Sequence, residues 1–434
     1  MTFHQRILLD RLLAVPLAVV LNALVRILGH LLHRDHSVNP SATRRIVVCK
    51  LVGMGSILQA TPLLRALKQQ FPQARLTFVT LRGNAGLVPL LEEIDEALYL
   101  DDRGALPMLG TTAKVLWNLI SCRVDHFFDL EIYSGFTCLL SLFSLARNRL
   151  GFYRHSNRFK KGIYTHLVYF NTRMPIRKIY LQLGGAAGAS MENDTLSSIR
   201  IDPAERQSMR EKLSSLGLKE GQSYLLINPN ASDLLRERRW PKEYFKEAIE
   251  GLTQKGFNVV LMGAKSEADF TSSLVEMLPQ SVRCRVFNTA GMLSMGELFA
   301  LIEKAQCVLT NDTGPMHIVF ALQRPVVCLV GPADPIHYGI EGPGVVTLYA
   351  PVPCSPCIYE VDSPPCGGDN ICMRRLLPRL VLDHLLALLA PGECVGGEGS
   401  SVGDHGVIRL PLVWQNTQGQ PLGVVVRSSL PTCK

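Results

Sequence analysis

The 434-residue sequence lacks two features that mark whole classes of protein. It contains no internal repeat, and none of its uncharged apolar runs reaches 18 residues. Without a repeat, and with 47% hydrophobic residues, the chain cannot be fibrous, collagen-like or wholly disordered. Without long apolar runs, it does not read as a polytopic membrane protein. The length predicts two or three globular domains with enough apolar residues to build cores.

Charge is also scarce, because only 19% of the residues are charged. Lys and Arg number 45 against 37 Asp and Glu, which gives a net charge of +8. This excess falls short of the dedicated basic stripe of a nucleic-acid binder, so we expect no nucleic-acid partner. It suits an anionic ligand or an anionic membrane surface.

Residues 1–44 are predicted to form a separate membrane-associating helix and linker. Residues 12–25 are uncharged and mostly apolar, but at about 1.5 Å per residue they cover only about 21 Å, too short to cross a bilayer core. Asp10 beside this run argues against a signal peptide. An amphipathic helix in the membrane interface is favoured, and the alternative is a helix packed on the protein's own core. The interfacial interpretation rests on the surrounding arginines Arg6, Arg11, Arg26 and Arg34.

The next segment has the pattern of a strand, a glycine loop and a helix. Residues 45–50 predict a buried strand, and residues 51–55 a tight loop. Ser56 is a good N-cap for a helix that extends to Phe71, and residues 76–80 predict the following strand. This is the start of a parallel, doubly wound sheet.

The alternation continues through residue 153 and begins again near Tyr224. The sequence therefore predicts an α/β chain with two Rossmann-like doubly wound domains and a central cleft at the carboxyl ends of their strands. We place these domains at residues 45–205 and 206–390. Residues 391–434 are Gly-rich and irregular apart from short apolar runs near Val407 and Val424, and we predict a loosely ordered tail.

Two segments of the second domain could hold an anion. Residues 311–317 follow a predicted strand and open a helix, so the amides of Thr313 and Gly314 could seat a phosphate. The alternative is an ordinary turn with an Asp cap. Residues 236–241 carry several guanidinium groups just beyond another strand, which could clamp a diphosphate. The alternative there is a solvated charge run.

Four of the twelve cysteines lie within one Pro- and Gly-rich loop, with C-x2-C-x8-C-x5-C spacing. Four thiolates could form a closed structural zinc site. An iron–sulfur cluster and reduced or locally paired thiols are the alternatives. The residues concerned are Cys354, Cys357, Cys366 and Cys372.

Taken in order, these segments resemble glycosyltransferase family 9, the bacterial ADP-heptose:lipopolysaccharide heptosyltransferases. The resemblance covers about residues 45–390. It is carried by residues 50–62 (KLVGMGSILQATP), 239–241 (RWP), 263–264 (GA), 312–317 (DTGPMH) and 331–335 (GPADP).

The resemblance implies a GT-B fold, in which the N-terminal domain binds the acceptor and the C-terminal domain binds the nucleotide-sugar. It implies transfer without a required cofactor, because basic side chains and helix N-termini stabilise the departing diphosphate. By position, Thr313, Gly314 and Arg238 would hold the pyrophosphate and Glu267 the ribose. The adenine would lie against apolar residues near Met262 and Leu293. The complete predicted donor site is Asn230, Arg238, Glu267, Asp312, Thr313, Gly314, Pro315, Met316 and His317, and Lys50, Gly53 and Gly55 belong to the acceptor-side loop.

The chain departs from the family at Ser56, where members typically carry the Asp that takes the acceptor proton. A hydroxyl cannot serve as that base at neutral pH, because almost none of it is ionised. Either the base has moved or activity is lost. Glu131, with Asp129 second, is the predicted replacement, and the alternative for Glu131 is a carboxylate that stabilises the helix after Tyr133.

The sequence thus predicts an inverting glycosyltransferase, peripheral to the cytoplasmic face of the bacterial inner membrane. Its donor would be an ADP-sugar, most simply ADP-heptose. Its acceptor would be an anionic glycolipid, such as the lipopolysaccharide core or another lipid-linked saccharide. The alternatives are transfer from a different nucleotide-sugar and a catalytically silent, envelope-associated relative that binds saccharide.

Overall fold

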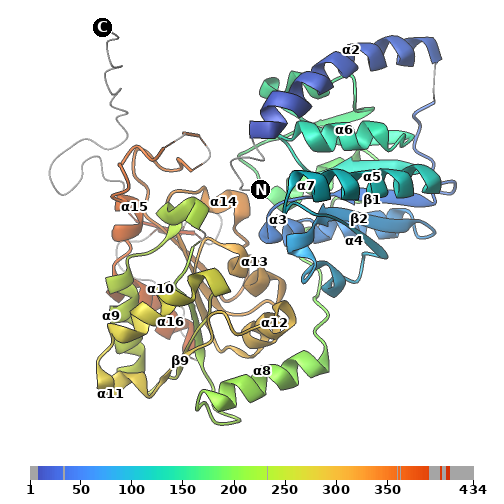
Figure 1. Ribbon diagram of the computed structural model, residues 1–434. Coiled ribbons are helices and arrows are strands. Elements are labelled where there is room, and N and C mark those ends of the chain that lie inside the picture. The colour runs from blue at the N-terminus through green and yellow to red at the C-terminus, as the bar shows by residue number, and fades with distance from the viewer. Residues whose placement is uncertain are drawn as a thin grey trace, which may run out of the picture. The chain divides into compact units, whose positions relative to one another are not determined.

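The computed structural model describes residues 8–32, 35–231, 233–358, 360–361, 363–390, 401–402 and 407–410. The chain divides into two compact units, Met1–Arg200 and Ile201–Lys434 (Figure 1). Each unit is built on a largely parallel sheet with helices packed on it, as the alternating pattern of the sequence predicts.

The sheet of the first unit has six parallel strands in the order β3-β2-β1-β4-β5-β6. The chain reverses its direction of travel across the sheet between β1 and β4, and in such sheets ligands bind where the carboxyl ends of the two strands diverge. The strands are β1 (Arg45–Cys49), β2 (Arg75–Leu81), β3 (Glu96–Leu100), β4 (His126–Asp129), β5 (Asn148–Tyr153) and β6 (His166–Tyr169).

The helix predicted from Ser56 to Phe71 is two helices, α3 (Met54–Gln59) and α4 (Thr61–Gln70). Pro62 lies in the first turn of α4, where its missing N–H is tolerated but an uninterrupted helix would not be. Helix α3 starts after Gly53, so Ser56 lies within it and is not its N-cap as predicted. The other helices of this unit are α5 (Ala105–Cys122), α6 (Gly135–Phe143), α7 (Ile176–Gly185) and the 3-10 segment η4 (His155–Lys160).

The N-terminal helix extends beyond both ends of the uncharged stretch at residues 12–25. A π-helical turn, η1 (Asp10–Ala14), continues into α2 (Val15–Leu32), and Asp10–Leu28 is long and apolar enough to cross a membrane by length and composition. One face, with Ala18 and Leu21, packs on α6 and η4 (Figure 1), and many apolar side chains of the opposite face are exposed. The packed face agrees with a helix that lies on the protein's own core, and membrane contact through the exposed face stays a prediction. Arg11 and Arg26 are exposed, and Arg6 and Arg34 lie outside the described residues.

The sheet of the second unit has the order β13-β14-β12-β11-β10-β7-β8-β9, with only the β13–β14 pair antiparallel. Its direction reverses between β7 and β10, which repeats the arrangement of β1 and β4. The strands are β7 (Leu225–Asn228), β8 (Val259–Leu261), β9 (Val286–Asn288), β10 (Val308–Asn311), β11 (Val326–Val330), β12 (Val345–Tyr349), β13 (Ser401–Val402) and β14 (Val407–Arg409).

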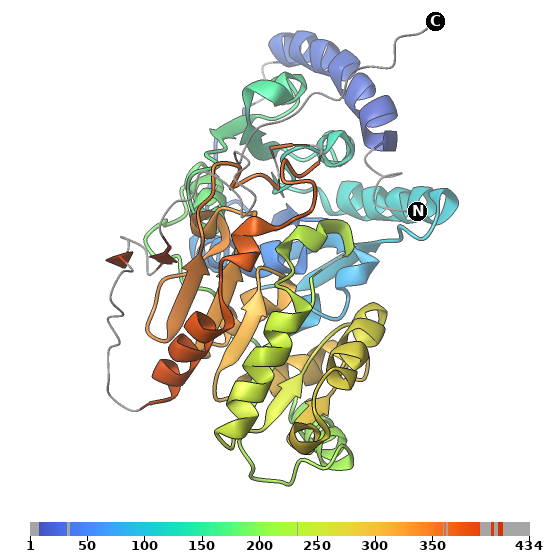
Figure 2. The same cartoon turned by 90° about the vertical axis from the view of Figure 1, so that its left-hand side faces the viewer.

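Helices α9 (Lys242–Gln254) and α16 (Pro378–Leu389) lie side by side over one face of this sheet (Figure 2). Trp240 is fully buried in the core beneath them, where its indole N–H donates to the carbonyl of Leu376 at 2.7 Å. The remaining helices are α8 (Pro203–Ser215), α10 (Ala268–Glu276), α11 (Gln280–Arg283), α12 (Met295–Lys304), α13 (Gly314–Ala321), α14 (Pro335–Tyr338) and α15 (Ile371–Arg374).

Part of the predicted tail belongs to this sheet. Strand β14 pairs with β12 in parallel, and the amide of Leu410 donates to the carbonyl of Tyr349 at 3.0 Å. Val407 and Ile408 are buried. The prediction of a loosely ordered tail is therefore wrong for residues 401–402 and 407–410, because an apolar run can extend a sheet by pairing with its outer strand. The run near Val424 lies outside the described residues.

Candidate functional site

The predicted phosphate loop lies at the switch point of the second sheet. Helix α13 begins directly after β10, and Thr313, its N-cap residue, has an extended backbone. Pro315 occupies the first turn, as expected, and residues 313–315 are half-buried. The first amides of a helix have no acceptor within it, and the helix dipole adds positive potential. This end of α13 can therefore receive an anionic oxygen.

Arg238 lies against the same loop. One of its Nη atoms donates to the carbonyl of Asp312 at 3.1 Å, and its Nε lies 3.5 Å from Oδ2 of that residue. Only 12% of the Arg238 side chain is exposed, so this guanidinium is not part of a solvated charge run. Arg239, the next residue, has other partners: it donates to the carbonyl of Ala231 at 2.7 Å, and its guanidinium lies over the ring of Phe270. The structure thus brings Arg238 and the start of α13 together, as predicted.

Two asparagines that the sequence analysis did not select hold this arrangement. Asn311 ends β10, accepts the Trp240 amide at 3.1 Å and donates to the carbonyl of Asn230 at 3.0 Å. Asn228 ends β7 and donates to the Thr313 hydroxyl at 2.9 Å. Both side chains are buried. The sequence did contain a signal for both residues, because each is an asparagine at the end of a buried apolar strand.

The predicted nucleotide end of the site lies at the carboxyl ends of β7 and β8. Asn230 is buried and donates to the carbonyl of Met262 and to the hydroxyl of Thr271, both at 3.1 Å. Glu267 is half-buried, and its Oε2 accepts the Ala264 amide at 2.8 Å. Met262 itself is buried and Leu293 is half-buried. The contact of the adenine with apolar residues near these two positions stays a prediction.

His317 and Met316 are both buried in α13. Burial, with a smaller contribution from the Arg238 charge, lowers the pKa of His317 to about 4 although Asp312 opposes the shift. The imidazole is therefore neutral at physiological pH. It contacts the ring of Tyr338 with 5.7 Å between ring centroids. His317 can offer a hydrogen bond but no charge to a ligand.

At the switch point of the first sheet, the glycine loop is held by Glu131. Its Oε1 accepts Lys50 Nζ at 2.8 Å, the Leu51 amide at 2.8 Å and the Val52 amide at 3.1 Å. Gly53 has φ of +91°, a left-handed conformation that favours glycine and turns the chain into α3. Gly55 is buried in the first turn of that helix. The predicted loop residues thus form one unit with the predicted base.

Two effects compete at Glu131. Burial raises its pKa, but the Lys50 charge and the hydrogen bonds together outweigh burial, so the net pKa is lowered. Burial likewise pulls the pKa of Lys50 down, but the Glu131 charge, the hydrogen bond to Glu131 and smaller contributions from Tyr180 and Asp129 together outweigh burial, so that pKa is raised. Both groups are therefore charged at neutral pH.

Asp129 lies deeper than Glu131 and is fully buried. Its Oδ1 accepts the Glu131 amide at 2.9 Å, and its Oδ2 accepts the hydroxyls of Thr137 and Tyr164. Burial raises the pKa of Asp129 despite the charge of Lys160, 4.0 Å away. A carboxylate with no exposed surface cannot contact an acceptor hydroxyl, so the geometry argues against Asp129 and leaves Glu131 as the candidate base.

The alternative role of Glu131, stabilising the following helix, belongs to another residue. The first amides of α6 donate to Asp10, from Gly135 at 2.9 Å and from Phe136 at 2.7 Å. Ser134 is the N-cap and accepts the Thr137 amide. Sequence distance hid this contact, because Asp10 lies more than 120 residues from α6.

Ser56 is half-buried in the first turns of α3. It hydrogen-bonds the hydroxyl of Tyr180 from α7, and burial raises the pKa of Tyr180 to about 12. The position that departs from the family is thus occupied by a neutral pair of hydroxyl groups beside the Lys50–Glu131 pair.

The four clustered cysteines lie close enough to affect one another's charge. Burial and the neighbouring thiols raise the pKa of Cys357 to about 11 and that of Cys372 to about 12. All four are free thiols. Within the ranges that the structure describes, no three His, Cys, Asp or Glu side chains are arranged to hold a metal ion. The geometry gives the zinc interpretation no support, and zinc binding stays a prediction. Metal analysis of the purified protein tests it, and less than half an equivalent of zinc per chain would contradict it.

Comparison with known proteins gives a consistent result. The family model described as glycosyltransferase family 9 (heptosyltransferase) matches residues 146–366. Lipopolysaccharide heptosyltransferase 3 of Escherichia coli K12 is 27% identical over 308 residues, which span 68% of this chain and 85% of the relative. Lipopolysaccharide heptosyltransferase 2 of Salmonella typhimurium is 25% identical over 297 residues, 67% of this chain and 84% of the relative.

Solved structures share the fold. A glycosyltransferase family 9 protein from Veillonella parvula superposes with a TM-score of 0.68 at 20% identity, over 82% of this chain and 99% of that one. ADP-heptose lipopolysaccharide heptosyltransferase II of E. coli gives 0.65 at 20% identity, over 80% and 98%. The E. coli heptosyltransferase WaaC, solved with ADP-2-deoxy-2-fluoro heptose, gives 0.59 at 18% identity, over 79% and 99%.

Proposed function

Because this chain belongs to glycosyltransferase family 9, and is therefore a glycosyltransferase with the GT-B fold, we propose that it moves a heptose from ADP-heptose onto a lipid-linked saccharide. The acceptor is the lipopolysaccharide core or a similar anionic glycolipid. The names of the relatives support this assignment, and so do the ADP and the ADP-heptose analogue in the solved WaaC structures. In this proposal residues 45–205 bind the acceptor and residues 206–390 bind the donor.

The observation that carries the proposal is the position of Arg238 against Asp312 at the start of α13. As the bond between the sugar and the diphosphate breaks, negative charge builds up on the departing ADP. A guanidinium and a helix N-terminus, both fixed before the reaction, stabilise this charge most strongly at that moment. The same arrangement supplies the positive charge that a metal ion would otherwise provide, so the transfer requires no cofactor.

In the acceptor half of the reaction, Glu131 removes the proton from the acceptor hydroxyl. Its Oε1 is held by Lys50 and the loop amides, so the proton goes to Oε2. The acceptor oxygen then bonds to the anomeric carbon as the bond to the diphosphate breaks on the opposite side, which inverts that carbon. Ser56 and Tyr180 border the Lys50–Glu131 pair as uncharged neighbours.

The N-terminal helix supports a peripheral position on the cytoplasmic face of the inner membrane. Asp10 ties its start to α6, and the Asn22 amide donates to the carbonyl of Phe159 at 2.7 Å. These contacts hold one face of α2 on the protein, which a helix crossing the bilayer could not keep. The opposite, exposed apolar face suits insertion into the interface of the leaflet that contains the acceptor.

Calorimetric titration of the full chain with ADP, GDP and UDP tests the donor assignment. We expect ADP to bind at least tenfold more tightly than the other two. Arg238→Gln is expected to weaken ADP binding by roughly tenfold to a hundredfold, because a charge-assisted contact contributes about 1.5–3 kcal/mol. Arg379→Gln, which removes an exposed guanidinium on α16, is the matched control and should bind ADP normally. Preference for UDP or GDP would replace ADP-heptose with another donor.

The departure at Ser56 favours one second candidate, a catalytically silent relative that binds saccharide. Incubation with ADP-heptose and a deacylated lipopolysaccharide core separates the two. Release of ADP above background, coupled to a heptosylated product, excludes the silent relative. Tight ADP binding without any product would support it.

A further inference from the structure

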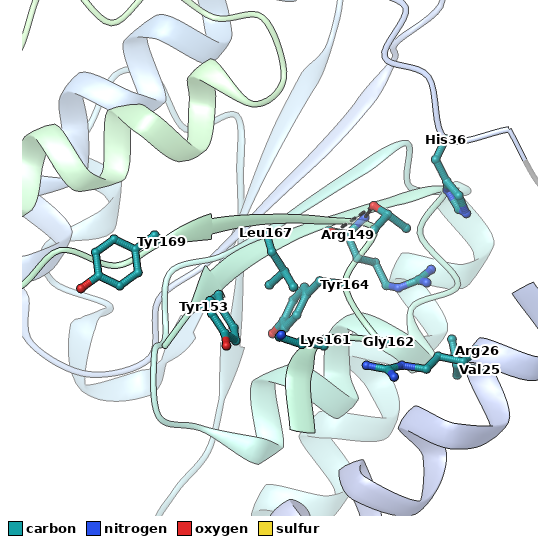
Figure 3. A pocket seen from close by; sticks show the side chains of 11 residues that line it. Val25, Arg26, His36, Arg149, Tyr153, Lys161, Gly162, Tyr164, Leu167 and Tyr169 are labelled. Atoms are coloured by element: carbon teal, nitrogen blue, oxygen red, sulfur yellow. Dashed lines mark hydrogen bonds between the residues drawn. The ribbon is translucent and has the colours of Figure 1, made fainter. Parts of the chain in front are cut away.

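A cavity of about 760 Å³ opens beside the N-terminal helix, and none of its lining residues is assigned to transfer. It is lined by residues of α2, β5 and β6, by the segment between η4 and β6, and by His36, which precedes β1 (Figure 3). All of these elements belong to the first unit. The cavity is therefore a candidate ligand site built from the first unit alone.

Three cations line this cavity. Arg26 comes from α2 and is exposed, and Lys161 lies over the ring of Tyr153 at 4.6 Å from its centroid. Arg149 is 8% exposed, and its guanidinium is held in place by the carbonyls of Ile163 at 2.7 Å and Ala146 at 2.9 Å. None of the lining residues, all of which are described, is acidic. The cavity is accordingly a place of positive potential.

The wall that α2 contributes is fixed in position. A Cβ at Gly162 would collide with the side chains of Asn22 and Arg26, so glycine is required for this close approach. The hydrogen bond from Asn22 to the carbonyl of Phe159 fixes the same turn of the helix. Arg26 is thus held at the rim of the cavity by a preformed contact, and its position does not depend on a ligand.

The apolar face of α2 is adjacent to this rim. The packed positions Ala14, Ala18 and Leu21 recur at helical spacing, and Arg26 follows on the border between the packed and exposed faces. The exposed side chains include Leu17, Val20, Leu24, Ile27 and Leu31. A helix that inserts this face into a leaflet lies at the boundary between headgroups and acyl chains. The cationic cavity beside it would then be level with the lipid phosphates.

From this arrangement we propose that the cavity binds the phosphate of an anionic bilayer lipid while the exposed face of α2 inserts between the acyl chains. Arg26 and Lys161 contact the phosphate oxygens, and Arg149 supplies positive charge from beneath. Guanidinium groups suit this role because their fixed fork of donors matches a phosphate. The inference rests on the proposed membrane position of the enzyme and adds a specific headgroup site to it.

Vesicle flotation with the full chain tests the site. The vesicles contain phosphatidylcholine with either phosphatidylglycerol or a fatty acid, which is added until the measured surface charge is equal. The fatty acid then supplies carboxylates without an added phosphate. We expect the wild type to prefer the phosphatidylglycerol vesicles. Arg26→Gln/Lys161→Gln should reduce binding to them by roughly tenfold or more, since each cation near an anionic surface contributes about a factor of five. Lys219→Gln/Lys255→Gln removes two exposed charges from the second unit and should change binding less than twofold.

Two results of the flotation would overturn the proposal: equal binding to both charged vesicles, or unchanged binding of the Arg26→Gln/Lys161→Gln variant. A third would come from thermal unfolding, if inorganic phosphate raised the unfolding temperature of the wild type as much as vesicles do. Failure of the wild type to bind any vesicle would overturn the membrane position as well. ADP titration of the same variant separates the site from the transferase. We expect normal ADP affinity, because neither residue belongs to the donor site.

Discussion

Lys50 and Glu131 form a nearly buried ion pair, with 2.8 Å between Nζ and Oε1. They come from the ends of β1 and β4, the two strands at which the first sheet reverses direction. Glu131 has both a structural role and the proposed catalytic role, because the oxygen that accepts the hydrogen bond from Lys50 also accepts those from two amides of the glycine loop. A change at Glu131 therefore affects both the loop and the reaction assigned to it.

Glu131→Gln is expected to lower kcat by at least a hundredfold, the usual contribution of a general base, and to leave the Kd for ADP unchanged. It should also destabilise the protein by about 3–5 kcal/mol, because the Lys50 charge is left buried without its partner. Steady-state kinetics and urea unfolding measure the two effects.

The double variant Lys50→Gln/Glu131→Gln separates these effects. With both charges gone, much of the lost stability should return, while kcat should remain low. Recovery of kcat together with stability would show that Glu131 acts only by holding the loop.

Asn311→Ala should destabilise the second unit, because Trp240 loses the acceptor of its buried amide and Asn230 loses the donor to its carbonyl. Each unsatisfied buried group costs about 1–3 kcal/mol. The displacement of the segment before Trp240 should also weaken ADP binding. Urea unfolding and ADP titration are the measurements. Asn258→Ala, at an exposed contact to the Ser223 carbonyl, is the control and should change neither. Normal ADP affinity for Asn311→Ala would deny it a positioning role.

Acid should destabilise the second unit through His317. Its pKa is lowered to about 4 in the folded protein, and the unfolded chain has the ordinary value of about 6.5. Between these values the unfolded state binds more protons, so stability is complete above pH 6.5 and declines as the pH falls toward 4. The decline is on the order of 3 kcal/mol.

Thermal unfolding from pH 7.5 to 4 measures this contribution. His317→Phe keeps a ring beside Tyr338 and should flatten the profile between pH 6.5 and 4. His155→Phe, at an exposed position, should leave the profile as in the wild type. If His317→Phe were as acid-sensitive as the wild type, His317 would not be the group responsible.

Asp10→Ala should loosen the N-terminal helix, because the Gly135 and Phe136 amides lose their acceptor. The expected cost is about 1 kcal/mol, typical of a lost helix cap. Hydrogen exchange at these two amides should become faster. Asp10→Asn can still accept hydrogen bonds and should retain most of the protection. Unchanged exchange in Asp10→Ala would mean that the helix is held by apolar packing alone.

The sequence by itself determined the class of fold and the positions of the motifs. Apolar runs of strand length, glycine loops and Pro315 in a first turn depend on neighbouring residues, so the sequence contains them directly. The same local rules failed where two signals competed. Pro62 divided the helix expected from Ser56, and Val407 and Ile408, from a segment predicted to be irregular, pair with β12 in the second sheet.

Only the tertiary structure decided which side chains meet. Arg238 and Asp312 are 74 residues apart, and Lys50 and Glu131 are 81 apart. Their contacts follow from strand order and register, which bring the carboxyl ends of β7 and β10, and of β1 and β4, next to each other. The burial of Asp129, the capping of α6 by Asp10 and the cationic cavity beside α2 depend on the same long-range packing. Local pattern cannot specify them, because each requires groups that meet only after the sheet has formed.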